Sequence, residues 1–390
     1  MILHCPTVSR ADGEVCVSAR VELQRAELGL PETLWFSFPE DHAPLVSERA
    51  DGFVVSLVLL AMALGEDMEV RGSLSPRLAY GLQEYQRFFH AMMPEAFRLI
   101  RIEPQRLQPP QRTAVPSGVA CAFSGGVDSF FTLWHHLPQN QPLPEFRLTH
   151  CLFVHGFDIP LAEKATFETC RQAYQKLLER LGVTLLSVRT NVRRFLARLD
   201  WHLAHGPALI GAALMLENLL GKFLVPGGYT YVDWYWDGSD PRINHLPSTE
   251  TLRVIHHGAD GKRVDKVAVV AHWPETYAAL RVCWERFDGL NNCCQCEKCI
   301  RTMLALEIEG ALDRYETFPL PLNARSFQAL RARYHTFHRS MPYYLRAART
   351  KERRDMLWLL YREALLGYAL IPPLWATRKV LALFRLLRRR

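Results

Sequence analysis

The stretch CAFSGGVDSFF, residues 121–131, decides how the rest of the chain is interpreted. Apolar residues from Val119 to Phe123 lead into Ser-Gly-Gly-Val-Asp-Ser, and an apolar pattern with a helical period follows. This order predicts a strand, a glycine-rich turn and a helix. Two adjacent glycines permit positive φ angles and a close approach of a ligand to the backbone. Successive backbone N–H groups in such a turn, together with the N-terminus of the next helix, attract anions.

The side chains of this turn suit the phosphates of a nucleotide. Ser124 and Ser129 provide hydroxyl donors, and the carboxylate of Asp128 can hold Mg²⁺ against phosphate oxygens. A Walker A motif, G-x-x-x-x-G-K-[ST], does not occur in the sequence. We therefore predict a nucleotide phosphate site of another kind. The alternative is an ordinary strand-to-helix turn that is rich in Gly, Ser and Asp.

The six residues Ser124–Ser129 resemble the PP-loop of the ATP pyrophosphatase superfamily, whose members cleave ATP between the α- and β-phosphates. The resemblance implies ATP and Mg²⁺ as cofactors, with Asp128 holding the metal and with Asp128 and Ser129 as catalytic residues. The nucleotide-binding residues that it implies are Ser124, Gly125, Gly126, Val127, Asp128 and Ser129.

Length and composition indicate a globular protein of more than one domain. A chain of 390 residues exceeds the usual size of one domain, and its charged fraction of 22% is typical of soluble proteins. The net charge of +7 is modest and is partly concentrated at the C-terminus, which argues against a large nucleic-acid surface without excluding nucleic acid. We expect a cytoplasmic protein, because no signal peptide and no long apolar run are evident.

The order of predicted elements suggests four regions. Alternating apolar residues from Val15 to Val21 predict a half-buried strand, and Phe53–Leu64 predicts an apolar helix or a buried segment. Ser75-Pro76 predicts the start of another helix, with Ser75 as its N-cap, so we expect a small N-terminal α/β domain. A segment rich in Pro, Gln and Arg predicts a linker. Alternating strands and helices then predict a doubly wound parallel sheet, with ligands at the carboxyl ends of its strands. The regions are the N-terminal α/β domain at 1–103, the linker at 104–116, the PP-loop domain at 117–312 and a helical C-terminal extension at 313–390.

Other polar residues near predicted strand ends are candidates for the same crevice, with loop capping as the alternative. They are Gly156-Phe157-Asp158, Thr190-Asn191 and Arg193. The long loop at 227–246 contains Trp234 and Trp236 and could stack a planar ring such as adenine. Arg263 and Lys266 could neutralise pyrophosphate, or could lie on a solvated helix face. We interpret His202 and His205 as packing residues on an apolar helix.

Four cysteines form a second motif, because Cys293, Cys296 and Cys299 follow a C-x-x-C-x-x-C pattern and Cys283 precedes them. Four thiolates at this spacing suit a closed, structural Zn²⁺ site in a reducing compartment. Cys294 could replace Cys293 as a ligand, and an iron–sulfur cluster is the alternative metal centre.

With the turn at Ser124–Ser129, this cysteine pattern is similar to that of the 7-cyano-7-deazaguanine synthases. These PP-loop enzymes activate a carboxylate with ATP and carry a structural zinc bound by four cysteines. The similarity covers the two motifs and not the N-terminal region or the C-terminal tail.

The resemblance implies a ligase that adenylates a small-molecule or modified-base substrate, with release of pyrophosphate and then attack by a nitrogen nucleophile. One alternative is thiolation of a tRNA base, which requires a reactive cysteine such as Cys121, Cys151 or Cys170. Another alternative is a catalytically silent nucleotide-binding scaffold.

The C-terminal tail, Leu374–Arg390, alternates apolar with basic residues in a helical stripe. Such a basic amphipathic helix could bind an acidic partner or an anionic membrane surface, which would place the protein peripherally at the inner membrane surface. The alternative is a terminal helix that packs on its own domain.

Overall fold

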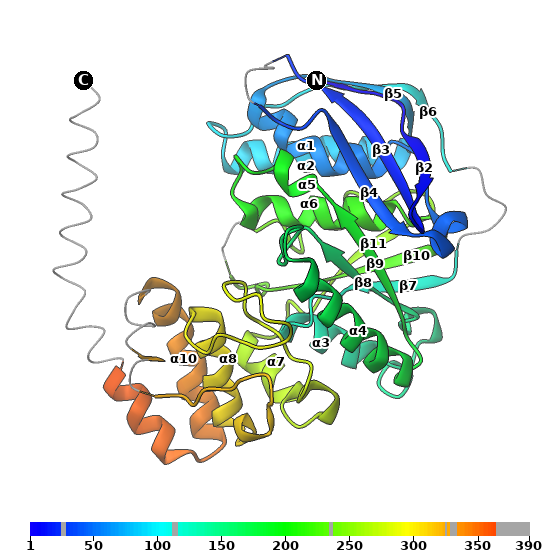
Figure 1. Cartoon of the computed structure of the whole chain (residues 1–390). Helices are drawn as coiled ribbons and strands as arrows, with labels where there is room; N and C mark the ends of the chain where they lie inside the picture. The colour runs from blue at the N-terminus through cyan, green and yellow to red at the C-terminus, as the bar shows by residue number, and fades with distance from the viewer. Residues whose placement is uncertain (25–28, 111–115, 234–236, 324–325, 328–333, 364–390) are drawn as a thin grey trace. The chain divides into compact units, whose positions relative to one another are not determined.

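The computed structural model describes residues 1–24, 29–110, 116–233, 237–323, 326–327 and 334–363 (Figure 1). The chain forms two compact units. The first contains Met1–Gly261 and Phe287–Leu290, and the second contains Lys262–Arg286 and Asn291–Arg390. The division therefore falls at Gly261, and the boundaries expected near 103, 116 and 312 do not separate compact units.

The first unit is built on a mixed sheet in which eleven strands are described. Their order is β11-β10-β7-β8-β9-β4-β3-β1-β5-β6, and β2 pairs with β3. The strands are β1 (Ile2–Leu3), β2 (Thr7–Ala11), β3 (Glu14–Glu22), β4 (Thr33–Pro39), β5 (Met68–Leu74), β6 (Ile102–Leu107), β7 (Gly118–Ala122), β8 (His150–His155), β9 (Thr184–Thr190), β10 (Leu220–Pro226) and β11 (Arg253–His257).

The helices of the first unit include α1 (Asp51–Leu64), α2 (Pro76–Met92), α3 (Val127–His136), α4 (Lys164–Arg180), α5 (Val192–Phe195) and α6 (Trp201–Leu214). Those of the second unit include α7 (Arg263–Val270), α8 (Glu297–Ile308) and α10 (Tyr334–Thr350), and residues 354–363 are also helical. The predicted α/β class and the mostly parallel sheet are confirmed. The predicted amphipathic tail, Leu374–Arg390, lies outside the described residues.

The five strands β7 to β11 are parallel to one another, and their order reverses beside β7. The chain runs from β7 outward through β8 to β9, and then returns to the other side of β7 for β10 and β11. A sheet with this order has a crevice outside the carboxyl ends of the two strands where the order reverses. Here those strands are β7 and β10.

Alternate side chains of β7 and β8 pack against helices on opposite faces of the sheet. Phe123, just past β7, contacts the rings of Phe130 in α3 and Tyr174 in α4, with ring centroids 5.1 and 5.2 Å apart. Ala120 and Leu152 belong instead to the core that contains α1 and α6. Figure 1 shows the same arrangement, with α3 and α4 on one side of these strands and α6 on the other.

The N-terminal strands extend the same sheet. β4 pairs antiparallel with β9, with Phe36 opposite Thr190. The alternating apolar residues predicted at Val15–Val21 form β3, whose inward side chains are buried. The segment at Phe53–Leu64, expected as an apolar helix or a buried segment, is α1. This helix is apolar on every side because it packs between the sheet and α6.

The predicted linker at 104–116 is partly wrong, because Pro104–Leu107 belong to β6. β6 pairs with β5 along one edge and has no strand on its other side among the described residues. Proline is tolerated in an edge strand because the missing N–H group can face away from the neighbouring strand. Proline content alone therefore did not distinguish this strand from a loop.

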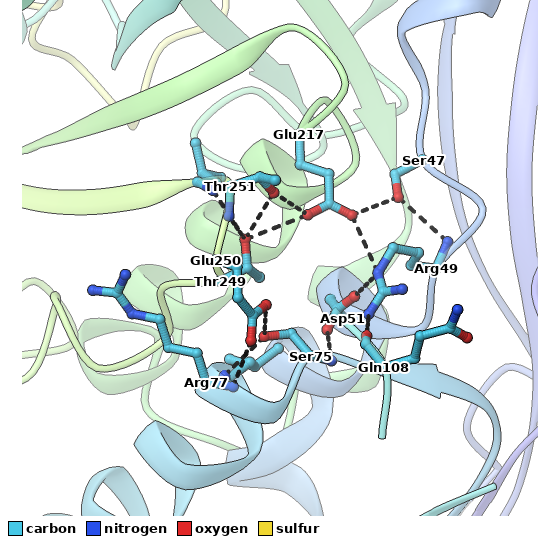
Figure 2. Close-up of polar contacts among 12 residues, drawn as sticks. Ser47, Arg49, Asp51, Ser75, Arg77, Gln108, Glu217, Thr249, Glu250 and Thr251 are labelled. Carbon is cyan, nitrogen blue, oxygen red and sulfur yellow. Dashed lines mark hydrogen bonds and ion pairs between the residues drawn. The ribbon is translucent and has the colours of Figure 1, made fainter. Parts of the chain in front are cut away.

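A buried polar network joins segments that are far apart in the sequence (Figure 2). Arg49 lies between two carboxylates, with its Nε atom 2.6 Å from Oδ2 of Asp51 and 3.5 Å from Oε1 of Glu217. Ser47 and Thr251 donate hydrogen bonds to Glu217 at 2.9 and 3.2 Å. One arginine thus faces two nearly inaccessible carboxylates, so the network carries excess negative charge when both are ionised.

The same network continues to the N-terminus of α2. Ser75 is the predicted N-cap, and its Oγ atom accepts a hydrogen bond from the backbone N–H of Leu78 at 3.0 Å. Glu250 accepts hydrogen bonds from Ser75 Oγ at 2.7 Å and from the backbone N–H of Arg77 at 2.9 Å. The loop that precedes β11 is thereby fixed to the N-terminal helices.

The network predicts a pH dependence of stability. Burial and the nearby Asp51 carboxylate raise the pKa of Glu217 to about 7. The folded state therefore holds this proton more tightly than the unfolded state does. The resulting stabilisation is fully present below the pKa that Glu217 has in the unfolded state. It is lost as the pH rises through about 7, the pKa of Glu217 in the folded state. We expect Glu217→Gln to abolish this decrease in the free energy of unfolding, which is on the order of 3 kcal/mol between pH 5 and 8. Chemical denaturation across that range measures it.

The matched control is Glu250→Gln. Burial opposes ionisation of Glu250, yet hydrogen bonds from Ser75 and Arg77 lower its pKa below the usual value. The stabilisation from Glu250 is present above the pKa of this residue in the unfolded state and is lost as the pH falls. The Glu250→Gln variant should therefore still lose stability as the pH rises toward 8. An unchanged pH dependence in a folded Glu217→Gln variant would contradict the account.

Candidate functional site

The predicted glycine-rich turn lies at the carboxyl end of β7, where the strand order reverses. β7 ends at Ala122, and α3 begins at Val127 with Gly126 as its N-cap residue. The backbone N–H of Phe123 donates to the carbonyl of Leu152 at 2.8 Å, which carries the pairing with β8 to the edge of the turn. The strand, turn and helix expected from residues 121–131 are thus present.

Gly125 shows why the turn requires glycine. Its φ angle is +74°, and a Cβ atom at this position would overlap the hydroxyl group of Tyr174. Tyr174 is fully buried between the rings of Phe123 and Phe153, with ring centroids 5.2 and 5.3 Å away. The core beneath the turn therefore leaves no room for a side chain, and it sets the path of the backbone.

The three polar side chains of the turn differ in what they can offer to a ligand. Ser124 is exposed, and its Oγ atom accepts a hydrogen bond from the backbone N–H of Gly126 at 3.3 Å. Ser129 is buried and donates to the carbonyl of Gly126 at 2.9 Å, so its hydroxyl already serves the helix terminus. Asp128 is half-buried in the first turn of α3. Ser124 and Asp128 are the side chains of this turn that solvent reaches.

Several other strand-end candidates serve the packing of the sheet. Thr190 donates to the carbonyl of Trp35 at 2.7 Å, and Asn191 both accepts from and donates to the β4 backbone. The guanidinium of Arg193 lies 4.8 Å from the ring centre of Trp201 and donates to the carbonyl of Phe157. These contacts give Thr190, Asn191 and Arg193 a structural explanation, as the capping alternative expects.

The remaining basic candidates belong to the other compact unit. Arg263 and Lys266 lie in α7 of the second unit, where the side chain of Lys266 is buried. The solvated helix face expected as the alternative for Lys266 is therefore wrong. Trp234 and Trp236, predicted to stack a planar ring, lie outside the described residues.

The four predicted metal ligands come together in the second unit. The Sγ atoms of Cys283, Cys293, Cys296 and Cys299 all lie within 4.8 Å of one another. The Sγ atoms of Cys293 and Cys299 are 3.8 Å apart. Four sulfurs bound tetrahedrally at about 2.3 Å from one zinc ion are about 3.8 Å apart, so the cluster fits one ion.

The backbone around the cluster favours thiolates. Backbone N–H groups of Gln295 and Cys296 donate to the Sγ atom of Cys293 at 3.4 and 3.2 Å, and that of Cys299 donates to Cys296 at 3.4 Å. Hydrogen bonds from the Cys296 and Cys299 thiols lower the pKa of Cys283 well below its usual range, and the same contacts raise the pKa of Cys296 and of Cys299. Without a metal ion, one thiolate is therefore held by two thiols. Thiolates are the form of cysteine that binds metal.

The structure selects Cys293 over its neighbour. Cys294 lies outside the group, has a φ angle of +55°, and directs its thiol to the carbonyl of Asn292 at 3.5 Å. Its left-handed conformation lets the chain reverse between Cys293 and Cys296. Cys296 is then the N-cap residue of α8.

Asn292 is a structural residue of this site that the sequence analysis missed. Its side chain is fully buried, and its Oδ1 atom accepts hydrogen bonds from the backbone N–H groups of Val282 and Cys283 at 2.8 and 3.0 Å. Its Nδ2 atom donates to the carbonyls of Leu280 and Thr317 at 2.9 and 3.1 Å. Asn292 thus fixes the Cys283 segment beside Cys293. Its position directly before the first clustered cysteine was the available signal.

The cysteines proposed for thiol chemistry are all buried. Cys121 and Cys151 are opposite each other on β7 and β8, with their Sγ atoms 3.6 Å apart. Burial, and then the Cys121 thiol, raise the pKa of Cys151 well above its usual value. Cys170 donates to the carbonyl of Gly289 at 3.4 Å. These environments disfavour a reactive thiolate.

A substitution at Gly125 tests whether the core sets the turn. We expect Gly125→Ala to destabilise the first unit by a few kcal/mol, because a methyl group must displace the buried Tyr174. Gly182→Ala is the matched control, since Gly182 has a similar φ angle of +70° and a Cβ atom added there would meet nothing within 4 Å. Thermal unfolding of both variants separates steric overlap from backbone strain. Equal stability losses would show that Tyr174 does not restrict the turn.

Metal content tests the cysteine cluster. The purified protein should hold about one zinc ion per chain in a four-sulfur shell at about 2.3 Å. Cys296→Ser should lose the metal and destabilise the second unit, because a closed site contributes folding free energy. Cys294→Ser should keep the metal and the stability of the second unit, since Cys294 lies outside the group of four cysteines. X-ray absorption and elemental analysis measure this. Iron with inorganic sulfide, or zinc loss from Cys294→Ser instead of Cys296→Ser, would contradict the assignment.

Among the described residues, no helix combines the length and the apolar character needed to cross a membrane. Comparison of the chain with protein-family models, with curated proteins and with solved structures finds no match.

Proposed function

We propose that the protein is an ATP-dependent enzyme that releases pyrophosphate and adenylates a carboxylate substrate, which a nitrogen nucleophile then attacks with release of AMP. One observation carries the proposal. The turn at Ser124–Ser129 follows β7, at the point where the parallel strand order reverses and where ligands of open α/β sheets bind. Both the motif and its position therefore favour a phosphate ligand.

The turn has the chemistry that phosphoryl and nucleotidyl transfer need. The N-terminus of α3 presents backbone N–H groups and the positive end of the helix dipole to an anion. Gly126 and Gly125 carry no side chains that would block the approach of phosphate oxygens. The exposed hydroxyl of Ser124 adds a donor. Such a site works by positioning and electrostatic stabilisation, so no nucleophilic side chain is required.

Asp128 is the residue that would hold Mg²⁺ in this proposal. It is half-buried in the first turn of α3, next to the N-terminus that would face the phosphates. Mg²⁺ bound there would neutralise phosphate charge during the departure of pyrophosphate. The buried hydroxyl of Ser129 would hold the turn through the Gly126 carbonyl, which makes it a positioning residue.

Thiolation of a nucleic-acid base is less well supported. It requires an accessible thiolate, and Cys121, Cys151 and Cys170 are all buried. The cysteine cluster fits a closed structural metal site, which leaves no ligand position for a reactive sulfur. A silent nucleotide-binding scaffold is the outcome in which ATP binds and no AMP forms.

Formation of AMP tests the proposal. Purified protein with ATP, Mg²⁺ and a panel of carboxylates and amines should release AMP and pyrophosphate in equal amounts. Asp128→Ala should lower the rate at least tenfold because the metal loses its carboxylate ligand. Asp41→Ala removes an exposed carboxylate outside the turn and should retain the wild-type rate. Release of ADP and phosphate, or wild-type turnover in a folded Asp128→Ala variant, would contradict the mechanism.

A further inference from the structure

A small pocket lies in the loop that follows β10, the strand paired with β7. Its volume is about 80 Å³, and its lining includes Tyr229, Asp237, Ser239 and Arg242. β7 and β10 are parallel neighbours, with Cys121 opposite Leu224, so the turn after β7 and this loop leave the same edge of the sheet. The pocket therefore belongs to the side of the first unit where a nucleotide would bind.

The loop is held tightly against α6. The backbone N–H of Gly238 donates to the carbonyl of His202 at 2.7 Å. A Cβ atom on Gly206 would overlap the carbonyl of Gly238, so the two backbones touch. The pocket is thus attached to a core helix, which fixes the side chains that line it.

His205, on α6, is oriented to accept a proton. Its Nδ1 atom is 3.1 Å from the carbonyl of Trp201, which can only accept, so Nδ1 carries hydrogen in this bond. The Nε2 atom of the neutral ring is then an acceptor, and it lies 3.0 Å from the hydroxyl of Ser239. This fixed tautomer directs the basic nitrogen to a residue that lines the pocket.

Asp237 makes the pocket suitable for a cation. Its side chain is buried, and its Oδ1 atom accepts from the backbone N–H of Ser239 at 2.8 Å. Within 4 Å, the basic side chains among the described residues are those of His205 and His202, at 3.5 and 4.0 Å. Asp240 differs, because Arg242 compensates its charge with Nε 2.8 Å from Oδ1. Asp237 therefore leaves a negative charge at the pocket whenever both histidines are neutral.

We propose that this pocket binds the nitrogen nucleophile as a primary amine, and that His205 removes its protons. The inference rests on the proposed function and names the class of its second substrate. Asp237 holds the ammonium group, and the rings of Tyr229 and Tyr231 provide aromatic surface for the rest of the amine. The small volume suits an amino group at the end of a longer molecule.

Two protons leave the nitrogen during the reaction, one before the attack and one after it. The ammonium passes the first proton through Ser239 to Nε2 of His205, which releases it to solvent. The nitrogen lone pair then attacks the carbonyl carbon of the acyl adenylate. The carbon–oxygen bond to phosphate breaks, and AMP leaves with the bonding electrons. The second nitrogen proton follows the same route, and the amide remains. Asp237, 3.5 Å from Nε2, stabilises the imidazolium that forms each time.

Amine binding without ATP tests the pocket by itself. Saturation-transfer NMR with n-butylamine should show saturable binding, and tetramethylammonium, which has no N–H donor, should bind at least tenfold more weakly. Asp237→Asn should weaken butylamine binding at least tenfold, whereas Asp260→Asn, which removes an exposed carboxylate that does not line the pocket, should not. Equal binding by a folded Asp237→Asn variant, or by tetramethylammonium, would overturn the proposal.

A second measurement avoids any dependence on the folding of that variant. A diazirine-bearing butylamine should crosslink the wild-type protein within residues 229–242, and crosslinks confined to other peptides would overturn the site. His205→Gln should lower amine-dependent AMP release at least tenfold and leave amine-independent release unchanged; equal effects on both would remove the base role. Amine binding without any AMP release would refute the proposed function alone, whereas AMP release without amine binding would refute the pocket alone.

Discussion

The parallel pairing of β7 between β8 and β10 is the constraint on which the candidate site depends. It places the end of β7 at the reversal of strand order, and it brings the loop after β10 to the same edge. The side chains beneath then fix the turn, because Tyr174 leaves no space for a Cβ atom at Gly125. The catalytic proposal follows from this backbone arrangement rather than from any reactive side chain.

The N-terminal strands and the buried polar network stabilise this same sheet. β4 continues the sheet beyond β9, and Glu217, just before β10, is tied to Ser47 and Arg49. Buried carboxylates cost free energy when their charges are not compensated. The network therefore links the ionisation of Glu217 to the position of β10, whose following loop contains the proposed amine pocket.

Local patterns in the sequence were enough to predict much of the fold. The apolar run before Ser124 predicted β7, the alternation at Val15–Val21 predicted β3, and Ser75-Pro76 predicted the start of α2. The spacing of Cys283, Cys293, Cys296 and Cys299 predicted a cluster that the structure brings together. These signals lie within short segments, where periodicity, capping and ligand spacing act directly.

Features that depend on distant contacts were not predicted. Glu217 and Ser47 are 170 positions apart, so no local sequence pattern predicts their hydrogen bond. His205 was interpreted as a packing residue because it lies on an apolar helix, and its contact with Ser239, 34 positions away, was not predicted. The part of the edge strand β6 from Pro104 to Leu107 was assigned to a linker, because its pairing with β5 is not evident from the local sequence.

The central claim is that the turn at Ser124–Ser129 binds the phosphates of ATP. A crystal structure of the protein with Mg²⁺ and the uncleavable analogue α,β-methylene-ATP tests it most directly. The account predicts phosphate oxygens within hydrogen-bonding distance of the backbone N–H groups of this turn, with the metal at Asp128. Phosphates bound elsewhere on the chain, with the turn at the end of β7 unoccupied at saturating nucleotide, would contradict it.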